Sequence, residues 1–139
     1  LKGEQKALCG QDFFLGVIRH FLRPMEPFDD MKVIYNRLVP FRGFTAINLM
    51  GVVFARVEYR PLSTAILRHE AIHTAQMKET AFLGFYLIYI SEWLWGLLRR
   101  QSPLAAYRAI RFEREAYRYM ADPSYLTRRH PYAWASMSQ

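Results

Sequence analysis

The sequence predicts an α+β protein in which a short strand hairpin or small sheet packs on a helical core of about three main helices. Two observations lead to this class. Residues 31–59 are rich in β-branched and aromatic side chains, and the segments that follow carry apolar side chains at helical spacing. The 139 residues, 52% of them hydrophobic, are enough for one domain with its own core. We therefore expect a single domain over residues 31–139.

Residues 1–30 are expected to form an N-terminal extension. Residues 1–11 are polar, and residues 12–24 (DFFLGVIRHFLRP) have apolar side chains at helix-like spacing between Asp12, which can cap a helix, and Pro24. This pattern predicts a short helix, followed by a linker rich in proline and aspartate over residues 24–30.

Two strand-like segments come next. The first, MKVIYNRLV (31–39), ends at Pro40. The second, GFTAINLMGVVFARVEY (43–59), is apolar on both faces at several points, as in a covered strand or a strand with a bulge near Gly51. The intervening PFRG is a turn candidate, so we predict a hairpin between the two segments.

Three helices are predicted in the rest of the chain. Ser63 or Thr64 can cap the first, which runs to about Lys78. The second covers AFLGFYLIYISEWLWGLL (81–98), and the third begins after the QSP at 101–103 and runs from Leu104 to about Met120. The tail, residues 127–139, is expected to pack back as a turn or a short helix.

The stretch RHEAIHTAQ (68–76) contains His69, Glu70 and His73 in the spacing H-E-x-x-H. Residues four apart lie on one face of a helix, so the two imidazoles can bind one metal ion. Glu70 is displaced by about 100° around the axis, where it can reach a water on that metal. Zinc lowers the pKa of such a water and a glutamate accepts the proton, as in metallohydrolases. We expect Zn²⁺ to bind here, with a chance pair of histidines as the alternative.

A catalytic zinc needs a third protein ligand, commonly a carboxylate. On the third predicted helix, Glu113 falls on a stripe of small and apolar residues that must face the core, where a carboxylate needs a partner such as a metal. Glu115 falls on a stripe that is otherwise charged, and Arg111 and Arg118 are its simplest partners in solvent. We therefore expect Glu113, rather than Glu115, to be the third ligand.

This ligand choice limits how residues 81–98 can lie. The segment is apolar except for Glu92 and is followed by Arg99 and Arg100, so it comes close to a membrane-spanning helix in length. A single span would place His73 and Glu113 about 30 Å apart. We prefer a buried central helix, in which Glu92 contacts Ser91 and Arg99. A membrane-surface or homo-oligomer contact is the second choice and a true span the third.

His69, Glu70 and His73, followed two helices later by FEREAY (112–117), resemble the gluzincin metallopeptidases. A group of small bacterial gluzincin-like proteins is more similar still, through GFTAINLMG, RHEAIHTAQ, YLIYISEWL and FEREAYRY, over roughly residues 31–134. The resemblance implies a minimal zincin-like fold and a glutamate ligand at Glu113, while the aspartate that supports a ligand histidine in the family is replaced by Tyr117. It also implies that the strand before the zinc helix borders the cleft and pairs with an extended peptide; an ordinary core strand is the alternative.

The sequence thus predicts a zinc metallopeptidase, a hydrolase of peptide or protein substrates with Glu70 as general base. Tyr117, Gln76 and Glu115 are candidates for supporting a ligand or acting as an electrophile, and Tyr125, Arg128 and His130 are further candidates for the electrophile. A solvent-exposed glutamine is an equal alternative for Gln76. The competing function is a non-catalytic, zinc-stabilised binding or regulatory module, because the short chain leaves little room for a lower subdomain. A basic protein with incidental histidines is the third hypothesis.

The formal net charge of +7 comes mostly from arginine and could favour anionic lipid or acidic partners. No nucleic-acid motif accompanies it, so specific nucleic-acid binding is not expected. The single cysteine, Cys9, excludes an intrachain disulfide and leaves the compartment undetermined, with a cytoplasmic or membrane-peripheral location favoured.

Overall fold

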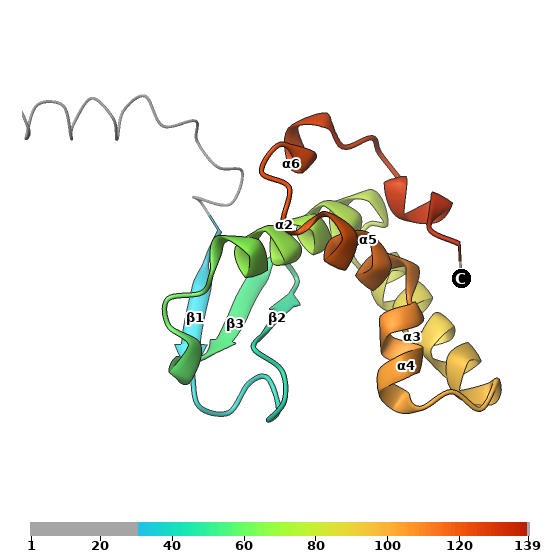
Figure 1. Cartoon of the computed structure of the whole chain (residues 1–139), viewed down its shortest axis with the longest axis horizontal. Helices are drawn as coiled ribbons and strands as arrows, with labels where there is room; N and C mark the ends of the chain where they lie inside the picture. Colours follow the sequence, from blue (N-terminus) through green and yellow to red (C-terminus); the bar gives the residue numbers. More distant parts are fainter. Residues whose placement is uncertain (1–30, 139) are drawn as a thin grey trace, which may run out of the picture.

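The computed structural model describes residues 31–138 and confirms the α+β fold with a helical core. A three-stranded sheet lies at one end of the molecule, and the other helices lie alongside α2 or beyond its C-terminal end (Figure 1). The elements in chain order are β1 (Val33–Asn36), β2 (Ala46–Leu49), β3 (Val52–Arg56), η1 (Val57–Tyr59), α2 (Thr64–Glu79), α3 (Leu83–Leu98), α4 (Pro103–Ala109), α5 (Arg111–Tyr119), α6 (Tyr125–Arg128) and η2 (Ala133–Ser136). The helix predicted over residues 12–24 lies outside the described residues.

The sheet has the strand order β1-β3-β2, with β1 parallel and β2 antiparallel to β3. The hairpin therefore joins β2 to β3, and its two turn residues, Met50 and Gly51, have φ angles of 55° and 87°. Two consecutive positive φ angles match the tight turns that suit hairpins. The prediction of a hairpin through PFRG is wrong, because β1 and β2 do not pair with each other. The prediction of one strand over residues 43–59 is also wrong, because the chain reverses at Gly51, between two runs of strand-forming residues.

One face of β3 packs on the beginning of α2. Val53 and Ala55 are fully buried and contact Leu62, with Ile66 and Leu67 packed against them. The hydroxyl of Ser63 accepts a hydrogen bond from the backbone N–H of Ile66, so Ser63 caps α2 as predicted. The sheet thereby fixes the N-terminal end of α2, the helix that carries His69, Glu70 and His73.

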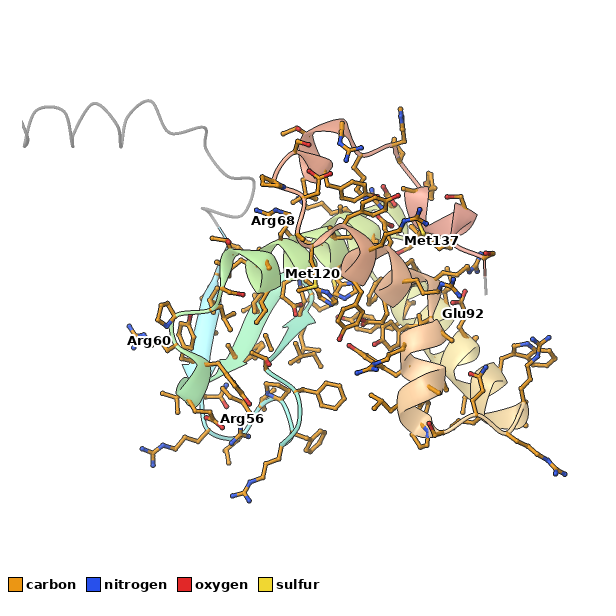
Figure 2. The ribbon with its side chains drawn as sticks, in the orientation of Figure 1. Arg56, Arg60, Arg68, Glu92, Met120 and Met137 are labelled. Carbon is orange, nitrogen blue, oxygen red and sulfur yellow. The ribbon has the colours of Figure 1, made fainter. Side chains whose placement is uncertain are left out.

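The third predicted helix is two helices, α4 and α5, separated at Ile110, whose ψ of 129° is extended. The carboxylate of Glu92, which is labelled in Figure 2, accepts hydrogen bonds from the backbone N–H of Arg111 at 2.8 Å and from its guanidinium Nε at 2.5 Å. A carboxylate in this position satisfies a free N–H at the start of α5. The predicted contacts of Glu92 with Ser91 and Arg99 are wrong.

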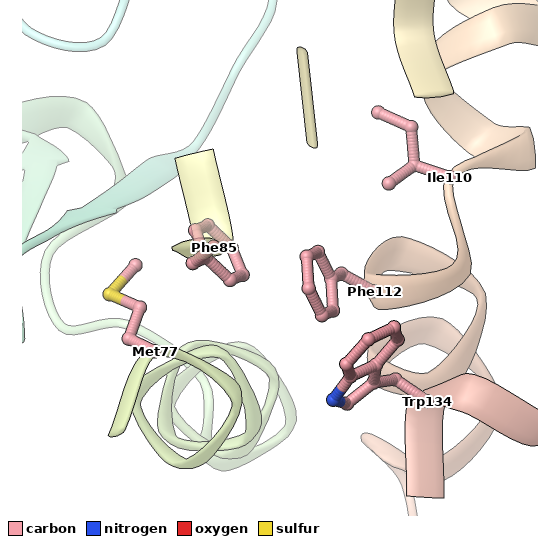
Figure 3. Close-up of a cluster of buried hydrophobic side chains, with 5 residues drawn as sticks. All are labelled: Met77, Phe85, Ile110, Phe112 and Trp134. Carbon is pink, nitrogen blue, oxygen red and sulfur yellow. The ribbon is translucent and has the colours of Figure 1, made fainter. Parts of the chain in front are cut away.

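A cluster of five buried side chains joins the helices (Figure 3). Phe85 of α3 stacks on Phe112 of α5 with ring centroids 4.5 Å apart, and Phe112 contacts Trp134 of η2 at 4.7 Å. Met77 of α2 and Ile110 complete the cluster. The tail therefore packs back on the core, as predicted, and holds α3 and α5 near the C-terminal end of α2.

Helix α3 is not the buried central helix that we preferred. Of its residues, only Phe85 and Gly96 are buried. A Cβ atom added at Gly96 would lie 2.7 Å from the Cβ of Ala106, so this glycine permits the close packing of α3 on α4. The opposite face of α3 is open to solvent. No single helix of the described residues is long and apolar enough to cross a bilayer; α2 and α3 pass that test only as a pair bent by 110°.

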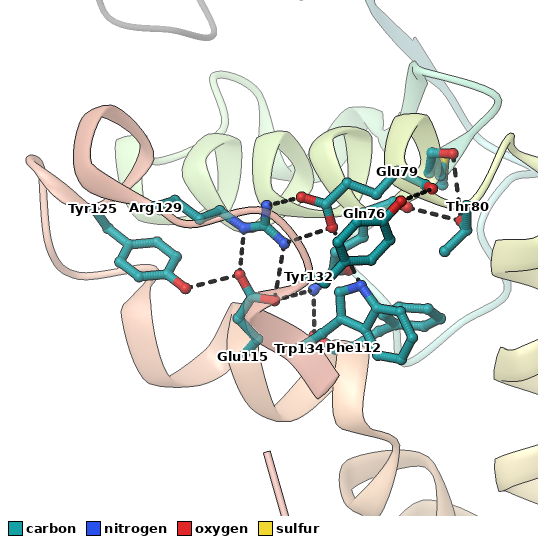
Figure 4. A network of polar contacts seen from close by, with 10 residues as sticks. Gln76, Glu79, Thr80, Phe112, Glu115, Tyr125, Arg129, Tyr132 and Trp134 are labelled. Carbon is teal, nitrogen blue, oxygen red and sulfur yellow. Dashed lines mark hydrogen bonds and ion pairs between the residues drawn. The ribbon is translucent and has the colours of Figure 1, made fainter. Parts of the chain in front are cut away.

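Glu115 is fully buried, and its partners are not those predicted (Figure 4). Its Oε1 accepts hydrogen bonds from the hydroxyl of Tyr125 at 2.8 Å and from Nε of Arg129 at 2.5 Å. Arg129 also forms an ion pair with Glu79 of α2. The prediction of a solvated Glu115 is wrong, because Tyr125 and Arg129 from the C-terminal part of the chain contact it and cover this side of α5.

Replacing Arg129 should be strongly destabilising. Its side chain is 5% exposed, and Arg129→Ala would leave Glu115 buried without its cation, a loss of about 3–5 kcal/mol. The neighbouring Arg128 pairs with Asp122 at the surface, with 58% of its own side chain exposed, so Arg128→Ala should cost less than about 1 kcal/mol. Urea unfolding of both variants measures the difference, and equal losses would contradict this account of the ion pair.

Candidate metal centre

His69 and His73 of α2 and Glu113 of α5 converge on one point. The Nε2 atoms of the two histidines are 3.0 Å apart. Glu113 Oε2 lies 3.3 Å from His69 Nε2, and Glu113 Oε1 lies 3.3 Å from His73 Nε2. All three residues are buried, and their potential ligand atoms lie within 4.8 Å of one another. They form a group that can hold a metal ion.

Buried polar atoms without hydrogen-bond partners support this interpretation. Glu113 Oε1 accepts a hydrogen bond from the hydroxyl of Tyr89 at 2.8 Å, whereas Glu113 Oε2 is buried and accepts none. His69 Nδ1 and Glu70 Oε2 are also buried without a hydrogen-bond partner. An ionised carboxylate in the interior needs a compensating charge, and a divalent cation beside the two imidazoles would supply it.

The carboxylate of Glu113 and the imidazole of His73 shift each other's pKa. Burial would raise the pKa of Glu113, but the imidazoles of His73 and His69 hold this pKa well below its usual range. Burial would lower the pKa of His73, but the Glu113 carboxylate and the hydrogen bond to Gln76 raise it to about 9. In the metal-free protein, Glu113 is therefore the counter-charge of a protonated His73.

Gln76 determines which nitrogen of His73 is available to a metal. The Nε2 amide of Gln76 donates hydrogen bonds to the carbonyl of Phe112 at 3.1 Å and to Glu115 Oε2 at 3.0 Å. Its Oε1 must then accept from His73 Nδ1, which lies 2.8 Å away. With a proton fixed on Nδ1, Nε2 is the nitrogen that faces Glu113, and it can bind a metal once it has lost its own proton. Gln76 is fully buried, so the alternative of an exposed glutamine is wrong.

Three tyrosines, Tyr89, Tyr107 and Tyr117, lie at or near the candidate metal-binding group. Tyr89 was not predicted from the sequence, because a tyrosine within an aromatic run gives no signal distinct from packing. The ring of Tyr117 contacts the ring of His69 edge-on with centroids 4.7 Å apart, and its hydroxyl lies 3.5 Å from that of Tyr107. Tyr117 thus contacts His69 through its ring, while its hydroxyl lies near that of Tyr107.

Glu70 lines the same cavity as the three metal-binding candidates. Burial raises the pKa of its carboxyl above the usual value. The cavity has a volume of about 390 Å³ and is lined mostly by apolar and aromatic side chains. Its other lining residues include Phe44, Ile47, Leu49, Tyr86 and Tyr107. The site therefore combines a metal-binding group, a carboxylate beside it and room for an apolar ligand group.

The remaining candidates from the sequence lie away from this cavity. Tyr125 donates to Glu115, Arg128 pairs with Asp122, and His130 is exposed. None of the three lines the cavity. Glu115 acts on the site indirectly, because it accepts a hydrogen bond from Gln76, which in turn contacts His73.

The sequence matches no protein-family model, and neither the curated proteins nor the solved structures contain a match to it.

Metal uptake should release a proton at neutral pH. The pKa of His73 is raised to about 9, so its Nε2 is protonated at pH 7 in the metal-free protein and must lose that proton to bind a metal. We expect about one proton released per metal bound at pH 7, and weaker binding as the pH falls below about 9. Calorimetric titration with ZnCl₂ in buffers of different ionisation enthalpy counts the protons. Binding without proton release at pH 7 would refute this assignment of His73.

Gln76→Leu should weaken metal binding without removing a ligand. The variant deletes the acceptor for His73 Nδ1, and the loss of such a supporting group typically lowers metal affinity about ten- to a hundredfold. Competition with a chromophoric chelator measures the affinity, and circular dichroism verifies that the variant is folded. Gln101→Leu, an exposed glutamine, is the matched control. A folded Gln76→Leu protein with unchanged affinity would exclude this role.

Proposed function

We propose that this chain is a zinc-dependent metallopeptidase in which His69, His73 and Glu113 bind the metal and Glu70 is the general base. The observation that carries the proposal is that the three candidate ligands and Glu70, whose buried Oε2 has no hydrogen-bond partner, line one cavity. Two imidazoles and one carboxylate are a common ligand set of catalytic zinc, which keeps its fourth position for water. The resemblance of residues 68–76 and 112–117 to gluzincins supports the same choice of metal and reaction.

The chemistry follows from the positions of the side chains. Zinc in this site would lower the pKa of a bound water and polarise a substrate carbonyl. Glu70 accepts the proton of the attacking water and returns it to the departing amine. Burial raises its pKa from the ordinary glutamate value towards the range in which a carboxylate can both accept and return a proton. Glu113 remains ionised and is held by Tyr89, and His73, which is neutral when it binds the metal, is held by Gln76.

The edge of the sheet beside the cavity can hold an extended peptide. The backbone N–H of Arg56 donates to the carbonyl of Thr45, so Thr45 and every second residue after it face β3. The backbone groups of Ala46 and Asn48 then point to the other side of β2, where no strand of the described residues pairs with them. Both residues line the cavity. A substrate strand that pairs there would run past the metal.

The cavity walls favour an apolar residue of the substrate. Phe44 and Tyr107 meet edge-on at 5.6 Å, and no lysine or arginine lines the cavity. Burial strongly raises the pKa of Tyr107, so its hydroxyl keeps its proton and can donate to a developing oxyanion. We assign this role to Tyr107 in preference to Tyr117, because Tyr107 lines the cavity.

Glu70→Gln separates catalysis from metal binding. The unmodified protein should contain one zinc per chain and cleave peptides with apolar residues at the scissile bond. Glu70→Gln should keep its zinc and lose at least about a hundredfold in kcat/KM, because the general base is absent. Metal analysis and a mass-spectrometric peptide-library assay provide the two readouts. Glu58→Gln, at a surface glutamate, is the matched control and should behave as the unmodified protein.

The remaining outcomes distinguish the alternatives. Zinc in the unmodified protein without cleavage of any library member would favour a non-catalytic, zinc-stabilised binding module. Absence of zinc from protein prepared with the metal would contradict both functions. Cleavage at an undiminished rate by Glu70→Gln would exclude Glu70 as the base.

A further inference from the structure

Helix α3 exposes a continuous apolar face. Five large side chains, separated by three or four residues, lie within an arc of about 80° at 100° per residue. We call them the α3 face: Leu83, Leu87, Ile90, Leu94 and Leu98, with exposed fractions of 68%, 60%, 53%, 48% and 76%. Figure 1 places α3 beside α4, at the end of the molecule away from the sheet. Single exposed leucines are ordinary, but a contiguous apolar stripe over a whole helix marks an interaction surface.

The described part of the chain does not cover this face. The opposite side of α3 packs inwards through Phe85 and Gly96, and Glu92, the one charged residue of the helix, turns inwards to Arg111. No polar residue on the α3 face compensates its exposure to water. The favourable free energy of burying these side chains, about 25 cal/mol per Å², is therefore available to a partner.

Positive charge and an aromatic ring flank the C-terminal end of the face. Trp95 is half exposed, and the guanidinium of Arg99 lies 5.0 Å from the centre of its ring. Arg100 follows, also exposed. Within residues 81–112, Glu92 is the only acidic residue, and Arg111 neutralises it. The surroundings of the α3 face are thus cationic.

We propose that the α3 face docks on the surface of an anionic lipid bilayer. The five apolar side chains enter the boundary between headgroups and acyl chains, with α3 parallel to the membrane plane. Trp95 lies at headgroup depth, and Arg99 and Arg100 pair with lipid phosphates. A second copy of the chain is a poorer occupant, because an isologous contact would bring two cationic surfaces together without a counter-charge. The proposal does not depend on the metal site.

Vesicle flotation tests the proposal. The unmodified protein should float with vesicles of phosphatidylcholine containing about 30 mol% phosphatidylglycerol, less so at high salt, and should not float with phosphatidylcholine alone. The double variant Leu87→Glu, Leu94→Glu should lower the bound fraction at least about tenfold, since it removes apolar contacts and adds negative charge. Arg99→Glu, Arg100→Glu should abolish the preference for the anionic lipid. Leu38→Glu, at a leucine that is 83% exposed outside the α3 face, is the matched control and should bind as the unmodified protein.

Two results would overturn the proposal. The first is failure of the unmodified protein to float with anionic vesicles at low salt. The second is equal flotation of the Leu87→Glu, Leu94→Glu protein, which would place the contact elsewhere. Sedimentation velocity tests whether the α3 face binds a second copy instead. If the unmodified protein is a dimer that does not bind vesicles, and the double variant is a monomer, the face is a dimer contact. Circular dichroism and zinc content of each variant separate loss of docking from loss of the fold or of the metal site.

Discussion

Gln76 on α2 and Glu115 on α5 are joined by a buried hydrogen bond, and the candidate metal centre depends on the helix pairing to which this bond contributes. Glu115 is held in turn by Arg129 and Tyr125, which come from the C-terminal part of the chain. Because Glu113 precedes Glu115 by two residues on the same helix, this pairing brings its carboxylate against the histidines of α2. The bond also orients Gln76 so that His73 offers its Nε2 lone pair. Loss of the whole α2–α5 pairing would remove the Glu113 carboxylate and the support of His73 together, whereas loss of the Gln76 amide alone removes only that support.

Apolar contacts also hold α5 against α2. Phe85, Phe112 and Trp134 stack where α3, α5 and η2 meet the end of α2, so aromatic packing closes the interior beside the polar network. Glu92 of α3 holds the first N–H of α5, so the chain bends at Ile110 and α5 takes its direction independently of α4. The packing therefore leaves one side of α3 beside the metal ligands, through Tyr89, and the other side in solvent.

The sequence predicted what depends on local spacing. It indicated the α+β class, the cap at Ser63, the pairing of His69 with His73 and the burial of Glu113. The predictions from sequence were wrong where residues far apart in the chain determine the structure. Glu115 was misplaced because nothing near it in the sequence reveals Arg129 or the bend at Ile110. The parallel pairing of β1 with β3 joins strands that are not consecutive, and the apolar composition of residues 81–98 predicted burial although only one side of α3 is covered. Tyr89 gave no signal, since its role depends on a carboxylate from another helix.

The central claim is that His69, His73 and Glu113 share one metal ion. X-ray absorption spectroscopy at the zinc edge, on protein loaded with one equivalent of zinc, tests it most directly. The account predicts a four-coordinate site with two imidazole nitrogens at about 2.0–2.1 Å and two oxygens, without sulfur. Glu113→Ala should keep the imidazole signal and change the oxygen shell. A spectrum without the outer-shell scattering of imidazole, or with six oxygen ligands, would contradict the assignment of the site.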